Sequence, residues 1–94
     1  MSETNQNYHA IIPLFILHSK VLPPTAKILY CEITSLLNRE GYCTTSNHIL
    51  GLNLNISESM VSRYISLLKD LNYIDDVAFD GRTRIIKISS KAGE

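Results

Sequence analysis

The chain has 94 residues, no net charge at pH 7, and an apolar fraction of 45%. This length supports one domain with one core, and the longest apolar stretch, residues 10–17, is too short to cross a membrane. The first seven residues lack the features of a signal peptide, so we expect a cytoplasmic protein. Nine basic and nine acidic residues exclude the basic excess that usually accompanies nonspecific nucleic-acid binding.

The cysteines and histidines form no pattern typical of a metal or catalytic site. Cys31 and Cys43 lack CxxC spacing, and the three histidines are scattered, so we expect two thiols, no metal and no cofactor. There is no glycine-rich phosphate loop and no Ser-His-Asp or Cys-His arrangement on recognisable elements. The adjacent Asp75 and Asp76 would point to opposite faces of a strand. We therefore expect that the protein is not an enzyme.

Residues 1–23 are predicted to form an N-terminal arm that contains a short helix. Residues 8–13 favour an extended conformation, and Pro13 is suited to open a helix through Lys20. The side chains expected to be buried in this helix are Leu14, Phe15 and Leu17, with Ile16 as a further candidate.

The next segment, residues 24–41, has the periodicity of an amphipathic helix. Pro24 suits the first turn, and Gly41 is expected to end the helix as its C′ residue. The apolar residues recur at spacings of three and four: Ala26, Leu29, Tyr30, Ile33, Leu36 and Leu37. After a short β-prone segment, residues 46–55 predict a helix of barely two turns, capped by Thr45 or Ser46 and followed by a tight turn.

A longer helix is predicted from a Ser57 cap to about Asn72, and its two sides differ sharply. Its apolar residues fall within an arc of roughly 160°. Short hydroxyl side chains permit close approach to another surface and donate to phosphates and base edges, and arginine can contact guanine or phosphate. A solvated polar face needs no partner, so both interpretations are open. The polar side comprises Glu58, Ser59, Ser62, Arg63, Ser66, Lys69 and Asp70.

Residues 73–89 predict a β-hairpin. Asp80-Gly81 favours a type I′ turn, which needs positive φ at both central residues. Arg82 and Arg84 are two residues apart on the return strand and so share a face. Beside the two preceding helices, these arginines make a local basic site in a neutral protein. Residues 90–94 are expected to form a tail.

The predicted order helix, strand, helix, helix, strand, strand from about Pro24 to Ile88 resembles that of winged helix-turn-helix domains. The segment "ISESMVSRYISLLKDLNYI" resembles a recognition helix of that family, with Asn72 where glycine is frequent. The resemblance implies a mainly α fold with a small β-hairpin (α+β). It places three core helices and a two- to three-stranded antiparallel wing within residues 24–89.

Residues 8–50 are also similar to the N-terminal domains of phage and plasmid replication-initiation proteins, through "YHAIIP", "PTAK" and "GYC". This similarity implies sequence-guided binding of double-stranded DNA, in replication initiation or transcription regulation. It implies three sets of DNA-binding residues: Ser57, Ser59, Ser62 and Arg63 in the major groove, with Ser66 on the same face; Ser46 and Asn47 near a phosphate; and Arg82 and Arg84 at a neighbouring backbone or minor groove.

The zero net charge leaves a second hypothesis open, in which the domain is a protein-interaction or self-association module. The apolar segment 8–17 would then pack on a partner subunit, although it would equally cover the domain's own core. A DNA-binding monomer with few cations should bind weakly, so the first hypothesis also favours homodimers, tandem copies or replication and transcription partners. An acidic residue on a protein surface that binds DNA needs an explanation, because DNA is itself negatively charged. Glu58 would support its helix N-terminus or accept from a cytosine amino group.

Overall fold

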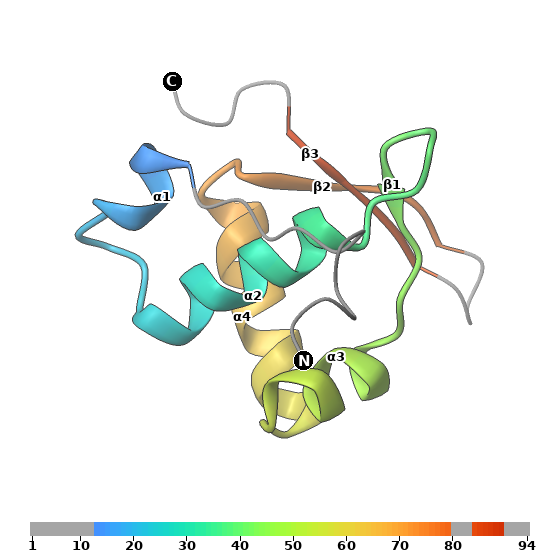
Figure 1. Ribbon diagram of the computed structural model, residues 1–94, viewed down its shortest axis with the longest axis horizontal. Helices are drawn as coiled ribbons and strands as arrows, with labels where there is room; N and C mark the ends of the chain where they lie inside the picture. Colours follow the sequence, from blue (N-terminus) through green and yellow to red (C-terminus); the bar gives the residue numbers. More distant parts are fainter. Residues whose placement is uncertain (1–12, 80–83, 90–94) are drawn as a thin grey trace, which may run out of the picture.

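Four helices and a small antiparallel sheet surround one core in this computed structural model, which describes residues 13–79 and 84–89 (Figure 1). The three longer helices contact one another, and the last of them also contacts the sheet. The predicted extended segment before Pro13, the Asp80-Gly81 turn and the tail lie outside the described residues. The elements are α1 (Leu14–Leu17), α2 (Pro24–Ser35), β1 (Tyr42–Cys43), α3 (Asn47–Leu54), α4 (Glu58–Asp70), β2 (Ile74–Phe79) and β3 (Arg84–Ile88).

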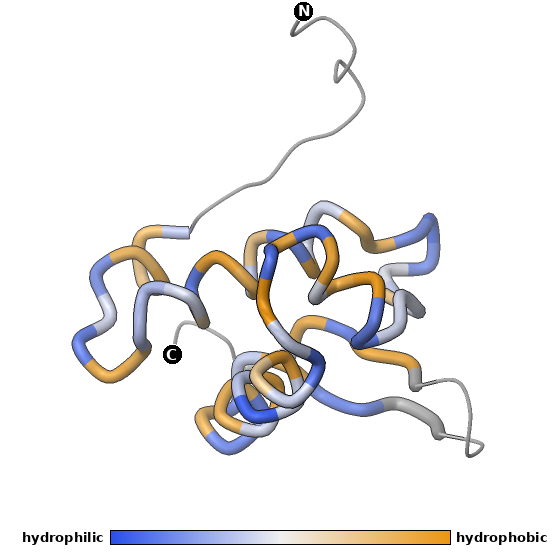
Figure 2. The backbone as a smooth tube through the Cα atoms, turned by 90° about the horizontal axis from the view of Figure 1, so that it is seen from below, coloured by the Kyte–Doolittle hydropathy of each residue, from blue (hydrophilic) through white to orange (hydrophobic). Residues whose placement is uncertain are grey.

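Each helix contributes one apolar side to the core, as the periodicity predicts. Apolar and polar residues alternate along the helical turns in Figure 2, which is the pattern of helices that are buried on one side. The side chains that are at most 1% exposed come from all parts of the domain and include Leu29 and Ile33 of α2, Leu50 of α3, Val61 and Leu68 of α4, Ile74 of β2 and Ile86 of β3.

The short helix α1 buries Ile16, the further candidate, and exposes two of the three residues that the sequence favoured. Ile16 is fully buried, whereas Leu14 and Leu17 are 67% and 47% exposed, so their predicted burial is wrong. Leu14 and Leu17 are three residues apart and share the outer side of this single turn. Phe15 is half-buried, and its ring centroid lies 6.5 Å from that of Tyr30 and 5.7 Å from that of Tyr73.

Helix α2 ends at Ser35 and does not continue to Gly41 as predicted. The hydroxyls of Thr34 and Ser35 donate to the carbonyls of the residues three positions earlier, at 2.7 and 2.8 Å. The side chain of Asn38 then accepts from the backbone N–H groups of Glu40 and Tyr42, both at 2.9 Å. These local bonds offer the backbone an alternative to further helical bonds. Gly41, with φ at +89°, belongs to the turn into β1.

The three strands form an antiparallel sheet in the order β1-β3-β2. Tyr42 of β1 pairs with Lys87 of β3, and Ile74 of β2 pairs with Ile88. The register between β2 and β3 shifts between Asp76 and Ala78, which is a β-bulge. The predicted fold is therefore confirmed as mainly α with a three-stranded antiparallel sheet, in the arrangement of a winged helix-turn-helix. In the part of the chain that the structure describes, no helix is long and apolar enough to span a membrane.

The burial of Ile16 predicts that α1 contributes to the stability of the whole domain. Replacing Ile16 with alanine should lower the free energy of unfolding by about 2–4 kcal/mol, because it leaves a cavity in the core. The matched change Leu14→Ala, at the 67% exposed position, should alter it by less than about 0.5 kcal/mol. Urea denaturation followed by circular dichroism measures both, and equal effects would contradict the assigned role of α1.

Candidate nucleic-acid interface

A tight turn connects α3 to α4 and ends α3 with an asparagine. Asn55 has φ 61° and ψ 44°, the left-handed conformation. Its N–H donates to the Leu52 carbonyl at 3.4 Å, and the N–H of Ile56 donates to the Gly51 carbonyl at 3.0 Å. These two bonds form a Schellman motif, in which asparagine is tolerated because it adopts the left-handed conformation more readily than other non-glycine residues. The chain therefore reverses immediately after α3.

Gly51 permits this reversal because its backbone lies against the turn. It is buried within α3, and a Cβ atom added there would lie 2.7 Å from the carbonyl oxygen of Ile56. That oxygen belongs to the backbone, so it cannot move aside as the end of a flexible side chain would. Only glycine fits here without displacing the turn.

Helix α4 begins at a serine cap and separates its buried and open sides clearly. The Ser57 hydroxyl accepts from the N–H of Met60 at 3.1 Å, as predicted for the cap. Val61, Ile65 and Leu68 are at most 2% exposed on the inner side. Four of the exposed residues on the outer side form what we call the open face: Ser59, Ser62, Arg63 and Ser66.

The C-terminus of α4 is followed by a left-handed asparagine, as is the C-terminus of α3. Asn72 has φ 65°, and the N–H of Tyr73 donates to the Leu68 carbonyl at 2.9 Å. This is the left-handed conformation that the sequence suggested for Asn72. The helix itself ends at Asp70, two residues before the predicted end.

The predicted DNA-binding residues of α3 lie at its N-terminus. The Ser46 hydroxyl accepts from the N–H of Ile49 at 3.2 Å, which identifies Ser46 as the cap. Asn47 is the first residue of the helix and is half-buried. Of the two arginines expected in the wing, Arg82 lies outside the described residues. Arg84 begins β3, where its backbone pairs with Phe79.

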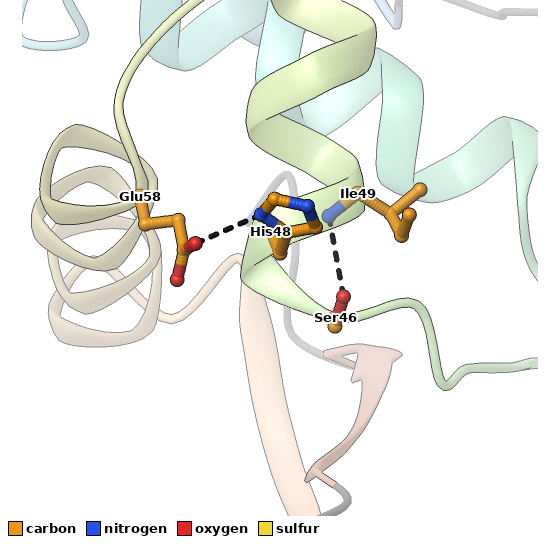
Figure 3. Close-up of polar contacts among 4 residues, drawn as sticks. All are labelled: Ser46, His48, Ile49 and Glu58. Carbon is orange, nitrogen blue, oxygen red and sulfur yellow. Dashed lines mark hydrogen bonds and ion pairs between the residues drawn. The ribbon is translucent and has the colours of Figure 1, made fainter.

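A hydrogen bond that sequence reasoning missed brings the N-termini of α3 and α4 together (Figure 3). His48 Nδ1 lies 2.9 Å from Glu58 Oε2, and both side chains are 62% exposed. The sequence indicated this contact only through position, because His48 lies in the first turn of α3 and Glu58 in the first turn of α4. The contact places a carboxylate beside the open face and holds it with an imidazole from the neighbouring helix.

The other polar contacts leave one cation on the open face. Lys69 Nζ lies 2.7 Å from Asp76 Oδ2, so the second cation of α4 is paired with β2. Arg63 makes no hydrogen bond or ion pair with the residues that the structure describes. Near the other end of α3, Asn53 Nδ2 donates to Oε2 of the buried Glu32 at 2.8 Å, and this hydrogen bond connects α3 to α2.

The cysteines lie away from this surface, in the core. Cys31 and Cys43 are buried free thiols. Burial, through desolvation, raises the pKa of the Cys31 thiol and keeps it protonated at neutral pH. Residues 13–79 and 84–89 contain no group of three or more His, Cys, Asp or Glu side chains that could hold a metal ion.

Comparison with known proteins gives one match. A family model described as a helix-turn-helix domain matches residues 20–74, more than half of the 94 residues. The match extends from the loop before α2 to the first residue of β2 and so includes both helices of the candidate interface. Neither the search of curated proteins nor the search of solved structures gave a match.

The close approach at Gly51 predicts an unusual response to alanine. Glycine-to-alanine changes inside helices usually stabilise by roughly 0.5–1 kcal/mol. Gly51→Ala should instead lower the free energy of unfolding by about 1–3 kcal/mol, because the new Cβ overlaps the Ile56 carbonyl. The control Asn55→Gly should stabilise by up to about 1 kcal/mol, since it relieves a left-handed conformation. Thermal and urea unfolding measure both, and stabilisation by Gly51→Ala would contradict the account of the turn.

Proposed function

Because the chain belongs to the helix-turn-helix domain family, we propose that it binds double-stranded DNA with sequence preference, using the open face of α4. In the helix-turn-helix docking mode the second helix enters the major groove, and its N-terminal residues contact base edges. Ser59, Ser62, Arg63 and Ser66 would supply these contacts, with Ser57 at the start of the helix.

The observation that carries the proposal is the contrast between the two sides of α4. The inner side is fixed in the core by residues at most 2% exposed, whereas every residue of the open face is exposed. The serines are short, so the helix backbone can approach a groove closely, and their hydroxyls can donate to base edges or phosphates. Arg63 is the longest side chain of this face and has no partner among the described residues.

Contacts with the DNA phosphate backbone would come from the elements beside α4. The N-terminus of α3, at Ser46 and Asn47, presents N–H groups and a favourable helix dipole to a phosphate. From the sequence, Arg82 and Arg84 would contact a neighbouring phosphate backbone or minor groove. Such contacts position the protein, whereas contacts to base edges specify the sequence.

The charge distribution indicates that one copy of the domain binds weakly. Three cations, Arg63, Arg82 and Arg84, serve the proposed surface in a chain without net charge. We propose that affinity is gained by linking sites, through a homodimer, tandem copies or a partner protein, as a module of replication initiation or transcription regulation in a phage or plasmid. We propose that the protein performs this role in the cytoplasm.

Self-association is the second candidate function, and exposed apolar side chains near the N-terminus favour it. Leu14, Leu17 and Val21 are 67%, 47% and 66% exposed. Sedimentation velocity tests this directly. A dimer in the wild type that dissociates more readily in Leu14→Ser would support a contact through α1, whereas a monomer at all concentrations would exclude it.

The proposed role of Arg63 predicts a loss of both affinity and selectivity. Arg63→Ala should weaken binding to a selected duplex by about 5- to 100-fold, corresponding to about 1–3 kcal/mol. It should weaken binding to a random duplex much less. Fluorescence anisotropy measures both, and Arg39→Ala, at an exposed position between α2 and β1, is the matched control. Wild-type affinity and selectivity in Arg63→Ala would remove Arg63 from the interface.

The proposed contacts with DNA phosphates predict that the affinity for duplex DNA depends modestly on salt concentration. With three cations at phosphates or bases, the plot of log Kd against log salt should have a slope of about 3 or less. Arg82→Ala should lower this slope by about 1 and weaken binding similarly for every sequence. Duplex binding that does not change with salt would contradict contact with the phosphate backbone.

A further inference from the structure

We infer that Glu58 selects cytosine at one position of the DNA target, and that His48 is the positioning residue that orients the Glu58 carboxylate. The inference rests on the proposed function, because it assumes that α4 lies in the major groove. It explains why an exposed carboxylate lies at the start of a helix that is otherwise suited to approach a polyanion.

The position of Glu58 is the first basis of the inference. Glu58 is the first residue of α4, and the N-terminal residues of a recognition helix are those nearest the base edges. At about 100° per residue, Glu58 and Ser62 lie within roughly 40° of each other, so Glu58 borders the open face. Its side chain is 62% exposed and is therefore accessible to a ligand that covers this face.

The contact with His48 is the second basis. The imidazole donates from Nδ1 to Oε2 at 2.9 Å, which leaves Oε1 to accept from another donor (Figure 3). A free glutamate side chain samples many rotamers, and a hydrogen bond from another helix restricts them. His48 comes from α3, and the turn at Gly51 fixes α3 relative to α4. The contact thus favours one orientation of the carboxylate before DNA arrives.

The chemistry of the major groove then selects the base. Cytosine presents its N4 amino group, which donates to a carboxylate. Guanine presents the acceptors N7 and O6, and thymine presents the acceptor O4, so each would face a carboxylate with a second negative group. Adenine presents an amino donor with the acceptor N7 next to it. Cytosine is therefore the base that fits an oriented Glu58 best.

A structural role of Glu58 at its helix N-terminus does not require the contact with His48. Exposed ion pairs contribute little to stability, and α3 and α4 are already held by the backbone turn and by the core residues Leu50 and Val61. A carboxylate near phosphates raises the energy of every complex in which it lacks a donor. That penalty becomes selectivity when one base supplies the donor.

Selection of bound duplexes from a random pool, with the full chain, tests the inference. We expect the wild type to enrich cytosine at one position of the motif by at least about fivefold over the other bases. Glu58→Gln should lose this preference and enrich adenine at the same position, because glutamine pairs with the N6 and N7 atoms of adenine. The rest of the motif, including the position contacted by Arg63, should be unchanged.

Three further variants separate positioning from folding. His48→Ala should reduce the cytosine preference severalfold, and His48→Asn, whose amide retains a donor, should restore most of it. Glu40→Gln makes the same charge change at an exposed position in the turn before β1 and should leave the motif unchanged. Circular dichroism melting should give the same Tm for the wild type and all four variants within a few degrees.

The outcomes distinguish failure of this inference from failure of the proposed function. If Glu58→Gln selects the same motif as the wild type, or only binds all sequences more tightly, the inference is wrong and the proposed function stands. An unchanged cytosine preference in His48→Ala overturns the positioning role of His48. A wild-type protein that enriches no sequence overturns the proposed function, and the inference with it.

Discussion

The whole candidate interface depends on one contact between backbones, where Gly51 lies against the carbonyl of Ile56. Because no Cβ intervenes, α3 can end and α4 can begin within three residues. Asn55 absorbs the reversal in the left-handed conformation. This short connection brings the N-termini of both helices to the same side of the domain, where His48 meets Glu58. A larger residue at Gly51 would change the relation between the two helices before it changed any surface side chain.

The two sides of α4 differ in burial, because the inner side packs in the core and the outer side is exposed. This separation allows the open face to vary in sequence with little effect on stability. The neutral charge of the chain has a related consequence. With Lys69 paired to Asp76, the described part of α4 presents one unpaired cation, so we expect little nonspecific attraction to DNA. In the proposed binding mode, selectivity would depend on the hydroxyls, on Arg63 and on the penalty that Glu58 imposes on unsuitable bases.

Several local features of the fold followed from the sequence, whereas the end of α2 and the buried side of α1 did not. The cap at Ser57, the two sides of α4 and the left-handed Asn72 follow from periodicity and residue chemistry within a few positions. The end of α2 did not, because Thr34, Ser35 and Asn38 compete with the backbone for hydrogen bonds. A single turn such as α1 has too few residues to show a period, so the sequence wrongly favoured burial of Leu14 and Leu17 over Ile16.

The candidate site shows the same division. The exposure of the serines and Arg63 was predictable because it follows from the helical period alone. The contacts of His48 with Glu58 and of Glu32 with Asn53 join residues 10 and 21 positions apart, and they depend on how the helices pack. Sequence spacing gives no signal for such pairs. The first of these contacts orients a carboxylate at the start of α4, and the second connects α3 to α2.

Amide chemical shifts test whether the open face of α4 contacts duplex DNA, as we propose. Titration of the ¹⁵N-labelled chain with a selected duplex should shift the amide signals of Ser59, Ser62, Arg63 and Ser66, together with those at the start of α3. The exposed side of α1, at Leu14 and Leu17, should remain unchanged. Shifts confined to α1, or none at saturating duplex, would contradict the account.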